Sequence, residues 1–184
     1  LIVLVGWGTF FSFGVFFEPV LKEFGWTRAE ISGAYSLATL IIGFMAIVMG
    51  RLNDRFGPRI VLTICGFFAG IGYFLISRIS EIWQLYLFYA VIVAVGVGGF
   101  FVPPTSTVAR WFVKRRAFMT GIVLLGVSFG VIIIPTLATW FIARFGWRLT
   151  YTIMGVVNLI VIISTAQLLK SDPQKVGKLP YGVD

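Results

Sequence analysis

Six long apolar runs alternate with short polar connections along this chain. A helix needs about 20 apolar residues to cross a hydrocarbon core about 30 Å thick, and each run is long enough. Barrel strands would be about 10 residues long with alternating polarity, whereas these runs are uniformly apolar. The pattern therefore predicts an all-α integral membrane bundle of six transmembrane helices, at residues 1–21, 30–50, 59–78, 82–109, 116–143 and 148–169.

The connections between the runs differ in their content of Lys and Arg. Ten of the 15 basic residues lie on one side and five on the other, and connections rich in Lys and Arg stay in the cytoplasm. The count predicts a multi-pass protein of the cell membrane with these connections in the cytoplasm. The ten are Arg51, Arg55, Arg59, Arg110, Lys114, Arg115, Arg116, Lys170, Lys175 and Lys178.

This orientation also divides the chain into two parts. Residues 1–169 are expected to form one bundle with the N-terminus in the cytoplasm. Residues 170–184 are polar and contain turn-forming Pro and Gly, so they are expected to begin a cytoplasmic linker to a further bundle.

Composition supports a lipid environment. The chain is 59% hydrophobic and 12% charged, with a mean hydropathy of +0.98, whereas soluble domains are nearer 45–50% apolar and about 25% charged. The net charge of +8 does not indicate nucleic-acid binding, because the basic residues form short clusters between apolar runs. There is no histidine and one cysteine, and no nucleophile–base pair or carboxylate pair, so no catalytic site, metal site or cofactor is predicted.

The interiors of the six runs contain no Asp, Glu, Lys or Arg. Ionisable residues inside membrane helices commonly mark ion and proton paths. This part of the chain is therefore not expected to hold a charged substrate at the membrane midplane by itself. Glu18, near the end of the first run, is the nearest candidate for a proton site, but an interfacial carboxylate beside Lys22 is the favoured interpretation.

Glycine pairs recur in the runs at four-residue spacing. Gly66 with Gly70, and Gly126 with Gly130, would let two helix backbones approach each other closely. We interpret them first as packing residues. Rocking or sliding of helices at these positions is a further hypothesis.

Prolines interrupt two of the runs. Pro103 and Pro104 lie late in the fourth run and Pro135 lies in the fifth. Each removes a backbone donor and predicts a kink or break in its helix. Broken helices also recur along transport pathways, so a functional role stays open beside the structural one.

Aromatic residues form a stripe on the first run. Phe10, Phe13, Gly14 and Phe17 follow the spacing i, i+3, i+4, i+7 and therefore share one helix face. Such a stripe usually packs in a core or faces lipid. The glycine within it favours a groove or a close helix contact.

Residues Gly50 to Arg59 carry charge of both signs in a short connection between two runs. Their sequence, GRLNDRFGPR, resembles the loop motif of the major facilitator superfamily, G-x-L-x-D-R-x-G-x-R/K, at every fixed position. The resemblance implies that Asp54 lies at a helix end and engages basic groups in the outward-open state. Arg55 and Arg59 would complete a cytoplasmic charge cluster around the Gly57 turn, and the cluster would act as a two-state latch.

A second motif narrows the resemblance. Residues 111–121 read WFVKRRAFMTG, which is similar to the monocarboxylate transporter signature Y-F-x-K-[RK]-R-x-L-A-x-G at Lys114, Arg115, Arg116 and Gly121. Oxalate/formate-type antiporters and bacterial relatives are also similar here, and this resemblance favours the bacterial inner membrane as the location. The sequences FGWTR after the first run and FGWR after the fifth resemble these porters too. The resemblance covers the N-terminal six of the family's twelve helices, which are arranged as 3+3 inverted repeats.

The resemblance implies half of a secondary transporter, and not an enzyme. The expected substrate is a small organic anion, preferably a monocarboxylate, moved with a proton or in exchange for another anion. The expected partners are the lipid bilayer and a C-terminal six-helix half. An apolar cavity wall that fits the organic tail of the substrate is expected from Phe10, Phe13, Phe17, Phe101 and Val127.

Departures from the family pattern place the carboxylate-binding groups elsewhere. Phe17 occupies a position where many monocarboxylate transporters carry lysine, and Phe100 or Phe101 replaces a tyrosine. Those groups are therefore expected in the second half. Two alternatives stay open, namely a drug or sugar porter on the same fold and a membrane scaffold or fragment without transport activity.

Overall fold

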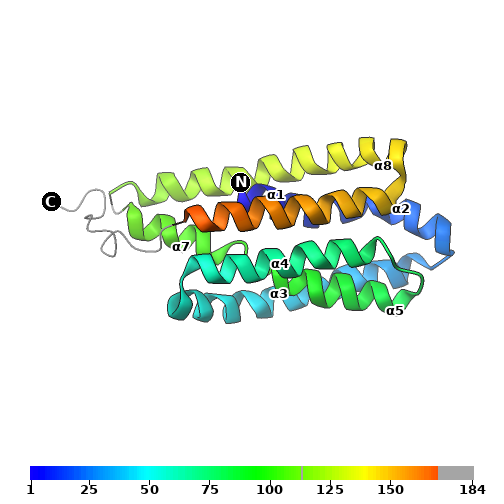
Figure 1. Cartoon of the computed structure of the whole chain (residues 1–184), viewed down its shortest axis with the longest axis horizontal. Helices are drawn as coiled ribbons and strands as arrows, with labels where there is room; N and C mark the ends of the chain where they lie inside the picture. The colour runs from blue at the N-terminus through cyan, green and yellow to red at the C-terminus, as the bar shows by residue number, and fades with distance from the viewer. Residues whose placement is uncertain (113, 170–184) are drawn as a thin grey trace.

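The computed structural model describes residues 1–112 and 114–169, and every regular element within them is a helix. The helices lie side by side in an elongated bundle (Figure 1). They are α1 (Ile2–Phe11), α2 (Phe13–Phe24), α3 (Arg28–Phe56), α4 (Pro58–Ile76), α5 (Ile82–Leu85), the π-helix η1 (Tyr86–Val93), α6 (Ala94–Val97), α7 (Val102–Trp111) and α8 (Arg116–Leu168).

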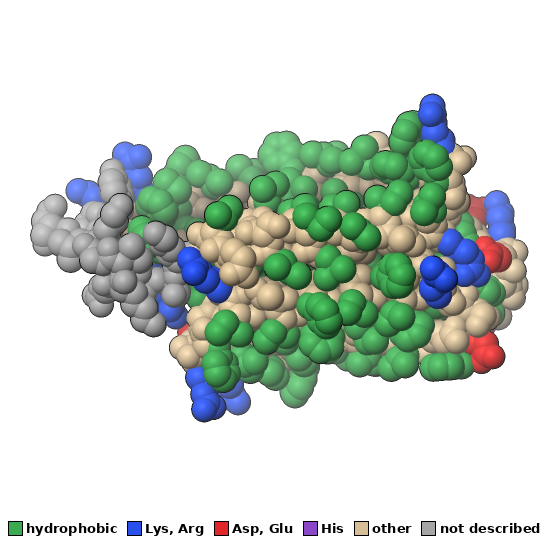
Figure 2. Space-filling model, viewed as in Figure 1, with side chains coloured by type: hydrophobic (Ala, Val, Ile, Leu, Met, Phe, Trp, Pro, Cys, Tyr) green, Lys and Arg blue, Asp and Glu red, His purple; other side chains and the backbone are tan. Residues whose placement is uncertain are grey.

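Hydrophobic side chains cover the long sides of the bundle, and charged side chains gather at its two ends (Figure 2). We call the end formed by residues 51–59 and 110–116 the basic end, and the end formed by residues 18–28, 77–83 and 144–148 the opposite end. In the described part of the chain, five helical segments are long and apolar enough to cross a membrane. This distribution is that of a multi-pass membrane protein, as the sequence predicted.

The sequence predicted six crossing helices, and the difference lies in α8. This helix has 53 residues and includes both of the last two expected runs. Gly146, with φ 79° and ψ 163°, is non-helical and divides α8 into residues 116–145 and 147–168, which run in opposite directions (Figure 1). Glycine adopts this positive φ without steric cost, so one residue suffices for the reversal.

Pro135 does not interrupt α8, contrary to the expected break. The backbone stays helical there, and the non-helical residue in α8 is Gly146. The hydroxyls of Thr136 and Thr139 donate to the carbonyls of Ile132 and Pro135, at 2.7 and 2.9 Å. Both hydroxyls bond within α8, to the carbonyl four residues earlier.

The fourth expected run is divided into α5, η1, α6 and α7, with the helix interrupted at residues 98–101. Pro103 and Pro104 follow this interruption in the first turn of α7, where a missing backbone N–H is tolerated. The helix therefore breaks just before the prolines rather than at them.

In η1, the hydroxyls of Tyr86 and Tyr89 donate to the carbonyls of Glu30 and Phe10, at 2.9 and 3.1 Å.

The expected loop at Gly50 to Arg59 is almost entirely helical. Helix α3 continues to Phe56, and α4 begins at Pro58. Gly57 alone separates them, with φ 83°. Proline cannot continue the preceding helix but is well suited to begin the next one, so a reversal of one residue is possible.

Backbone contacts at glycines hold the long helices together. A Cβ built on Gly8 of α1 would lie 2.6 Å from the carbonyl oxygen of Gly130 on α8. A Cβ on Gly70 of α4 would lie 2.9 Å from the carbonyl oxygen of Gly155 on the second arm of α8. These distances leave no room for a side chain, which confirms the packing role predicted for Gly70 and Gly130.

Replacement of Gly130 by alanine should therefore destabilise the bundle, because the new Cβ would overlap the backbone of Leu4. Overpacking of this kind costs about 1–3 kcal/mol. Gly126→Ala is the matched control, one turn earlier, where the nearest atom to a Cβ is Leu4 N at 4.0 Å. Thermal unfolding in detergent should show a lower Tm for Gly130→Ala only, and equal Tm values would contradict the contact.

Candidate functional site

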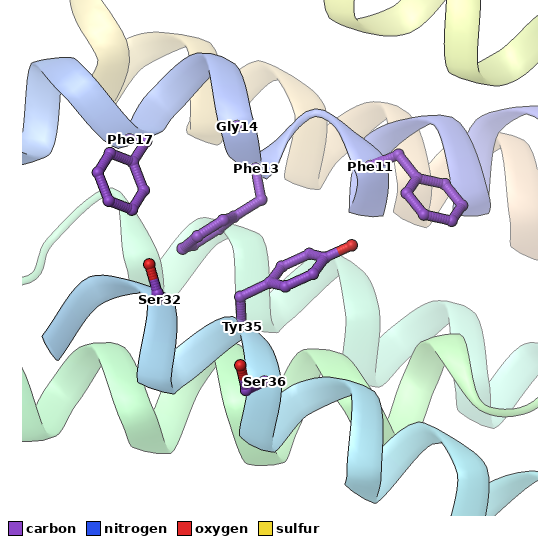
Figure 3. Close-up of a pocket in the computed structure, with 7 residues that line it drawn as sticks. All are labelled: Phe11, Phe13, Gly14, Phe17, Ser32, Tyr35 and Ser36. Carbon is purple, nitrogen blue, oxygen red and sulfur yellow. The ribbon is translucent and has the colours of Figure 1, made fainter. Parts of the chain in front are cut away.

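A cleft of about 330 Å³ lies between the first two membrane segments, Ile2–Phe24 and Arg28–Phe56. Figure 3 shows the rings of α2 and α3 projecting into the space between these two helices. The lining residues from α1 and α2 are Phe11, Phe13, Gly14 and Phe17, and those from α3 are Ser32, Tyr35 and Ser36.

Helical spacing brings these side chains together. Phe13, Gly14 and Phe17 follow one another at i, i+1 and i+4 along α2, so they occupy one side of that helix. On α3, the spacing i, i+3, i+4 aligns three hydroxyl-bearing residues, Ser32, Tyr35 and Ser36, along the facing side. The cleft thus has an aromatic wall and a hydroxyl-bearing wall.

Gly14 keeps the cleft open. A Cβ built on this residue meets nothing within 4 Å, unlike one built on Gly8 or Gly130. This glycine therefore leaves space rather than allowing a backbone contact. Any larger residue at this position would extend into the cleft.

Contacts between aromatic rings fix the shape of the cleft walls. The rings of Phe10 and Phe13 each lie 5.3 Å from that of Tyr35, with interplanar angles of 22° and 28°. Tyr89 of η1 lies 4.5 Å from Phe13, and its hydroxyl donates to the Phe10 carbonyl. Ring pairs at these separations attract one another beyond simple burial, so the wall has a defined shape.

The structure separates the five residues expected to form the cavity wall. Phe13 and Phe17 line the cleft. Phe10 is 2% exposed and lies behind the wall. Phe101 precedes α7, and Val127 is half-buried on α8, so neither borders this cleft. Sequence reasoning missed the hydroxyl-bearing residues of α3, although their spacing at i, i+3, i+4 was visible.

At the basic end, the motif beginning at Gly50 joins α3 to α7. Asp54 accepts a hydrogen bond from Arg110 Nη2 at 3.0 Å, and Asn53 Nδ2 donates to Ser106 Oγ at 3.1 Å. The side chains of Asp54 and Arg110 are 72% and 38% exposed. An ion pair so exposed is worth about 0.2–1 kcal/mol, which makes it easy to break.

The other basic residues of the two motifs have separate positions. Arg59 Nε donates to the carbonyl of Leu169 at the end of α8, and the guanidinium of Arg55 lies 5.3 Å from the Phe56 ring. Lys114, Arg115 and Arg116 are exposed where α8 begins. A Cβ built on Gly121 would meet no atom within 4 Å, whereas one built on Gly50 would lie 3.7 Å from the Val102 side chain. The expected linker at 170–184 lies outside the described residues.

A second ion pair ties together the opposite end. Glu23 at the end of α2 accepts hydrogen bonds from Arg148 Nη2 at 2.8 Å and from Trp147 Nε1. Arg148 Nη1 also donates to the Ser77 carbonyl at 3.0 Å. By contrast, Glu18 pairs with Lys22 at 3.1 Å with both side chains more than 70% exposed, which supports the interfacial role predicted for Glu18.

Comparison with known proteins places this fold in a class. The family model described as Major Facilitator Superfamily matches residues 1–182. The chain belongs to this superfamily of membrane transport proteins. A crystal structure of a bacterial homologue of the human lysosomal transporter Spinster, in an inward-facing and occupied conformation, has a TM-score of 0.73 at 19% identity, covering 94% of this chain and 43% of that one. At this identity the likeness concerns the fold.

Sequence relatives are transporters as well. The MFS-type transporter 1 of Ophiocordyceps sp. is 32% identical over 66% of this chain and 28% of that protein. Human monocarboxylate transporter 7 is 28% identical over 68% of this chain and 24% of that protein. Fungal efflux proteins match over similar lengths. The matched part of the chain thus spans about a quarter of the length of these relatives.

Double-mutant cycles should distinguish the pair Glu23–Arg148, which is joined by two hydrogen bonds, from the more exposed pair Glu18–Lys22. Coupling between Glu23 and Arg148, measured from the free energy of unfolding with Glu23→Gln and Arg148→Gln, should be about 1–2 kcal/mol, because two hydrogen bonds join partly covered charges. The control pair Glu18 and Lys22, which is exposed, should give about 0.3–0.5 kcal/mol. Equal coupling energies would show that the first pair does not hold this end together.

Proposed function

We propose that this chain is the N-terminal half of a secondary transporter that moves a small organic anion, preferably a monocarboxylate, by alternating access. The observation that carries the proposal is the apolar cleft between the first two membrane segments. None of the residues described as lining it is charged, so it suits the organic part of a substrate. The similarity to monocarboxylate transporters and the motif at Lys114 to Gly121 favour an acid as that substrate.

In this proposal the chain crosses the membrane six times, with the two arms of α8 as the last two crossings. The basic end faces the cytoplasm, in agreement with the excess of Lys and Arg there. A second six-helix half packs against this one and supplies the groups that bind the carboxylate, together with the coupling to a proton or a counter-anion. Rocking of the two halves then exposes the cleft to each side in turn.

The pair Asp54–Arg110 is the proposed latch of this motion. A switch requires a contact that holds one state and can be released at modest energy, because a very strong contact would trap the protein. The exposed pair at the basic end meets this condition. Asn53 and Ser106 lie beside it and keep α3 and α7 in register.

Uptake into liposomes tests the substrate class. The complete transporter, reconstituted in vesicles with and without a pH gradient, should accumulate at least one labelled acid among lactate, pyruvate, oxalate and formate. Vesicles without protein are the control for passive entry of the neutral acids. Failure with all four acids would end the proposal for a small monocarboxylate.

Export of a larger compound is the second candidate function. The match to fungal efflux proteins and the volume of the cleft favour it. Competition separates the two, because a drug or sugar porter would take up its own substrate without inhibition by small acids. A protein that transports none of these compounds would instead be a membrane scaffold.

Asp54→Asn should lower the maximal transport rate while leaving the KM within about twofold. The substitution removes the charge that Arg110 contacts, and loss of about 1 kcal/mol from one state corresponds to about a fivefold change in rate. Glu18→Gln is the matched control, since it removes a carboxylate from an exposed pair at the opposite end. An unchanged rate for Asp54→Asn would remove the latch from the mechanism.

A further inference from the structure

The cleft between α2 and α3 has features beyond its apolar character. Its walls present the rings of Phe11, Phe13, Phe17 and Tyr35, and its volume is about 330 Å³. That volume lies at the lower end of the range of sites that enclose drug-sized ligands, and it greatly exceeds the needs of a three-carbon acid. An acid such as pyruvate would leave most of this space unfilled.

The arrangement of the rings favours a planar guest. Phe13 and Tyr35 stack on each other, and they are held in orientation by Phe10, which stacks on Tyr35, and by Tyr89, which lies tilted against Phe13. Phe11 is 41% exposed, and its ring stacks on that of Trp7 at 5.6 Å. Aromatic rings bind other rings in offset-stacked and edge-to-face geometries, so fixed rings facing a cleft suit an aromatic guest better than an aliphatic one of equal size.

Hydroxyl groups give the opposite wall a different chemistry. Ser32 and Ser36 are exposed at the cleft, and the hydroxyl of Tyr35 points along it (Figure 3). These groups both donate and accept hydrogen bonds but carry no charge. They suit a ring with a polar substituent and leave the carboxylate to be bound elsewhere.

We propose that the cleft is a subsite for the aromatic ring of the transported substrate, which makes an aromatic acid rather than a two- or three-carbon acid the preferred substrate class. This inference rests on the proposed transport function and specifies it. It assigns Phe11, Phe13, Phe17 and Tyr35 to ring binding. Gly14 determines which substrates fit, because its missing side chain leaves the space that the ring occupies.

Gly14→Leu tests the subsite with little risk to folding. A Cβ at this position meets nothing within 4 Å, and leucine is a better helix former than glycine. The leucine side chain should extend into the cleft and displace a ring. Gly43→Leu is the matched control. Gly43 is also an exposed glycine of a membrane helix, a Cβ built on it meets nothing within 4 Å, and it does not line the cleft.

The experiment compares three labelled 2-oxo acids in liposomes containing the complete transporter: pyruvate, 4-methyl-2-oxopentanoate and phenylpyruvate. The unmodified protein should prefer phenylpyruvate by about tenfold in kcat/KM over the other two. Gly14→Leu should reduce phenylpyruvate transport by about tenfold and change pyruvate transport by less than twofold. Gly43→Leu should change neither.

Two results would overturn the ring subsite while leaving the transport function intact. One is equal kcat/KM for phenylpyruvate and the aliphatic acids. The other is an equal loss of transport of all three acids in Gly14→Leu. This result would mean that protein from the second half fills the cleft during closure.

A direct binding measurement separates failure of the subsite from failure of transport. If none of the three acids enters the vesicles, calorimetric titration of the detergent-solubilised transporter with phenylpyruvate still reports on the cleft. Binding that is lost in Gly14→Leu and kept in Gly43→Leu would support the ring subsite while the proposed transport of acids fails. Absence of binding to the unmodified protein would overturn the subsite.

Discussion

Direct contact between helix backbones at glycine residues is the interaction on which the bundle depends. Apolar helices in lipid gain little from the hydrophobic effect, because lipid tails are as apolar as their own side chains. Close packing between helices must therefore replace the hydrophobic effect as the source of stability. Gly8 meets Gly130, and Gly70 meets Gly155, with spacing that excludes a Cβ. These contacts bring α1 and α4 against the two arms of α8 and determine where the remaining elements can lie.

The cleft also depends on a glycine, but Gly14 leaves space open where the others bring helix backbones together. The cleft lies between the side chains of the first two membrane segments, and Gly14 leaves it unfilled. Polar contacts then stabilise the two ends of the bundle, through Glu23 with Arg148 at one end and Asp54 with Arg110 at the other. The two pairs differ in character. The first is supported by Trp147 and by the Ser77 carbonyl, whereas the second is more exposed and easier to break.

Much of this architecture could be predicted from the sequence, because apolar length determines which segments can cross lipid. The packing role of Gly70 and Gly130 also followed from spacing. The single-residue reversals at Gly57 and Gly146 could not be predicted, because they depend on φ values that composition does not reveal. A break was expected at Pro103 and Pro104, and it lies directly before them, at residues 98–101.

The site was only partly predictable for a related reason. A stripe on one helix reveals a face but not what that face meets. Phe13 and Phe17 reached the cleft, while Phe10 from the same stripe turned into the core, where Tyr89 bonds its carbonyl. The spacing of the serines on α3 does not by itself identify them as cleft residues. Their position opposite the rings of α2 does.

We propose that the cleft becomes accessible from each side of the membrane in turn. Ser36→Cys places a thiol in the cleft, in a transporter where Cys65 of this chain and any cysteine outside it are replaced by alanine. A membrane-impermeant thiol reagent, applied to oriented vesicles from either side, should label this residue from both sides. Substrate should change the two labelling rates in opposite directions. Labelling from one side only, unaffected by substrate, would contradict alternating access.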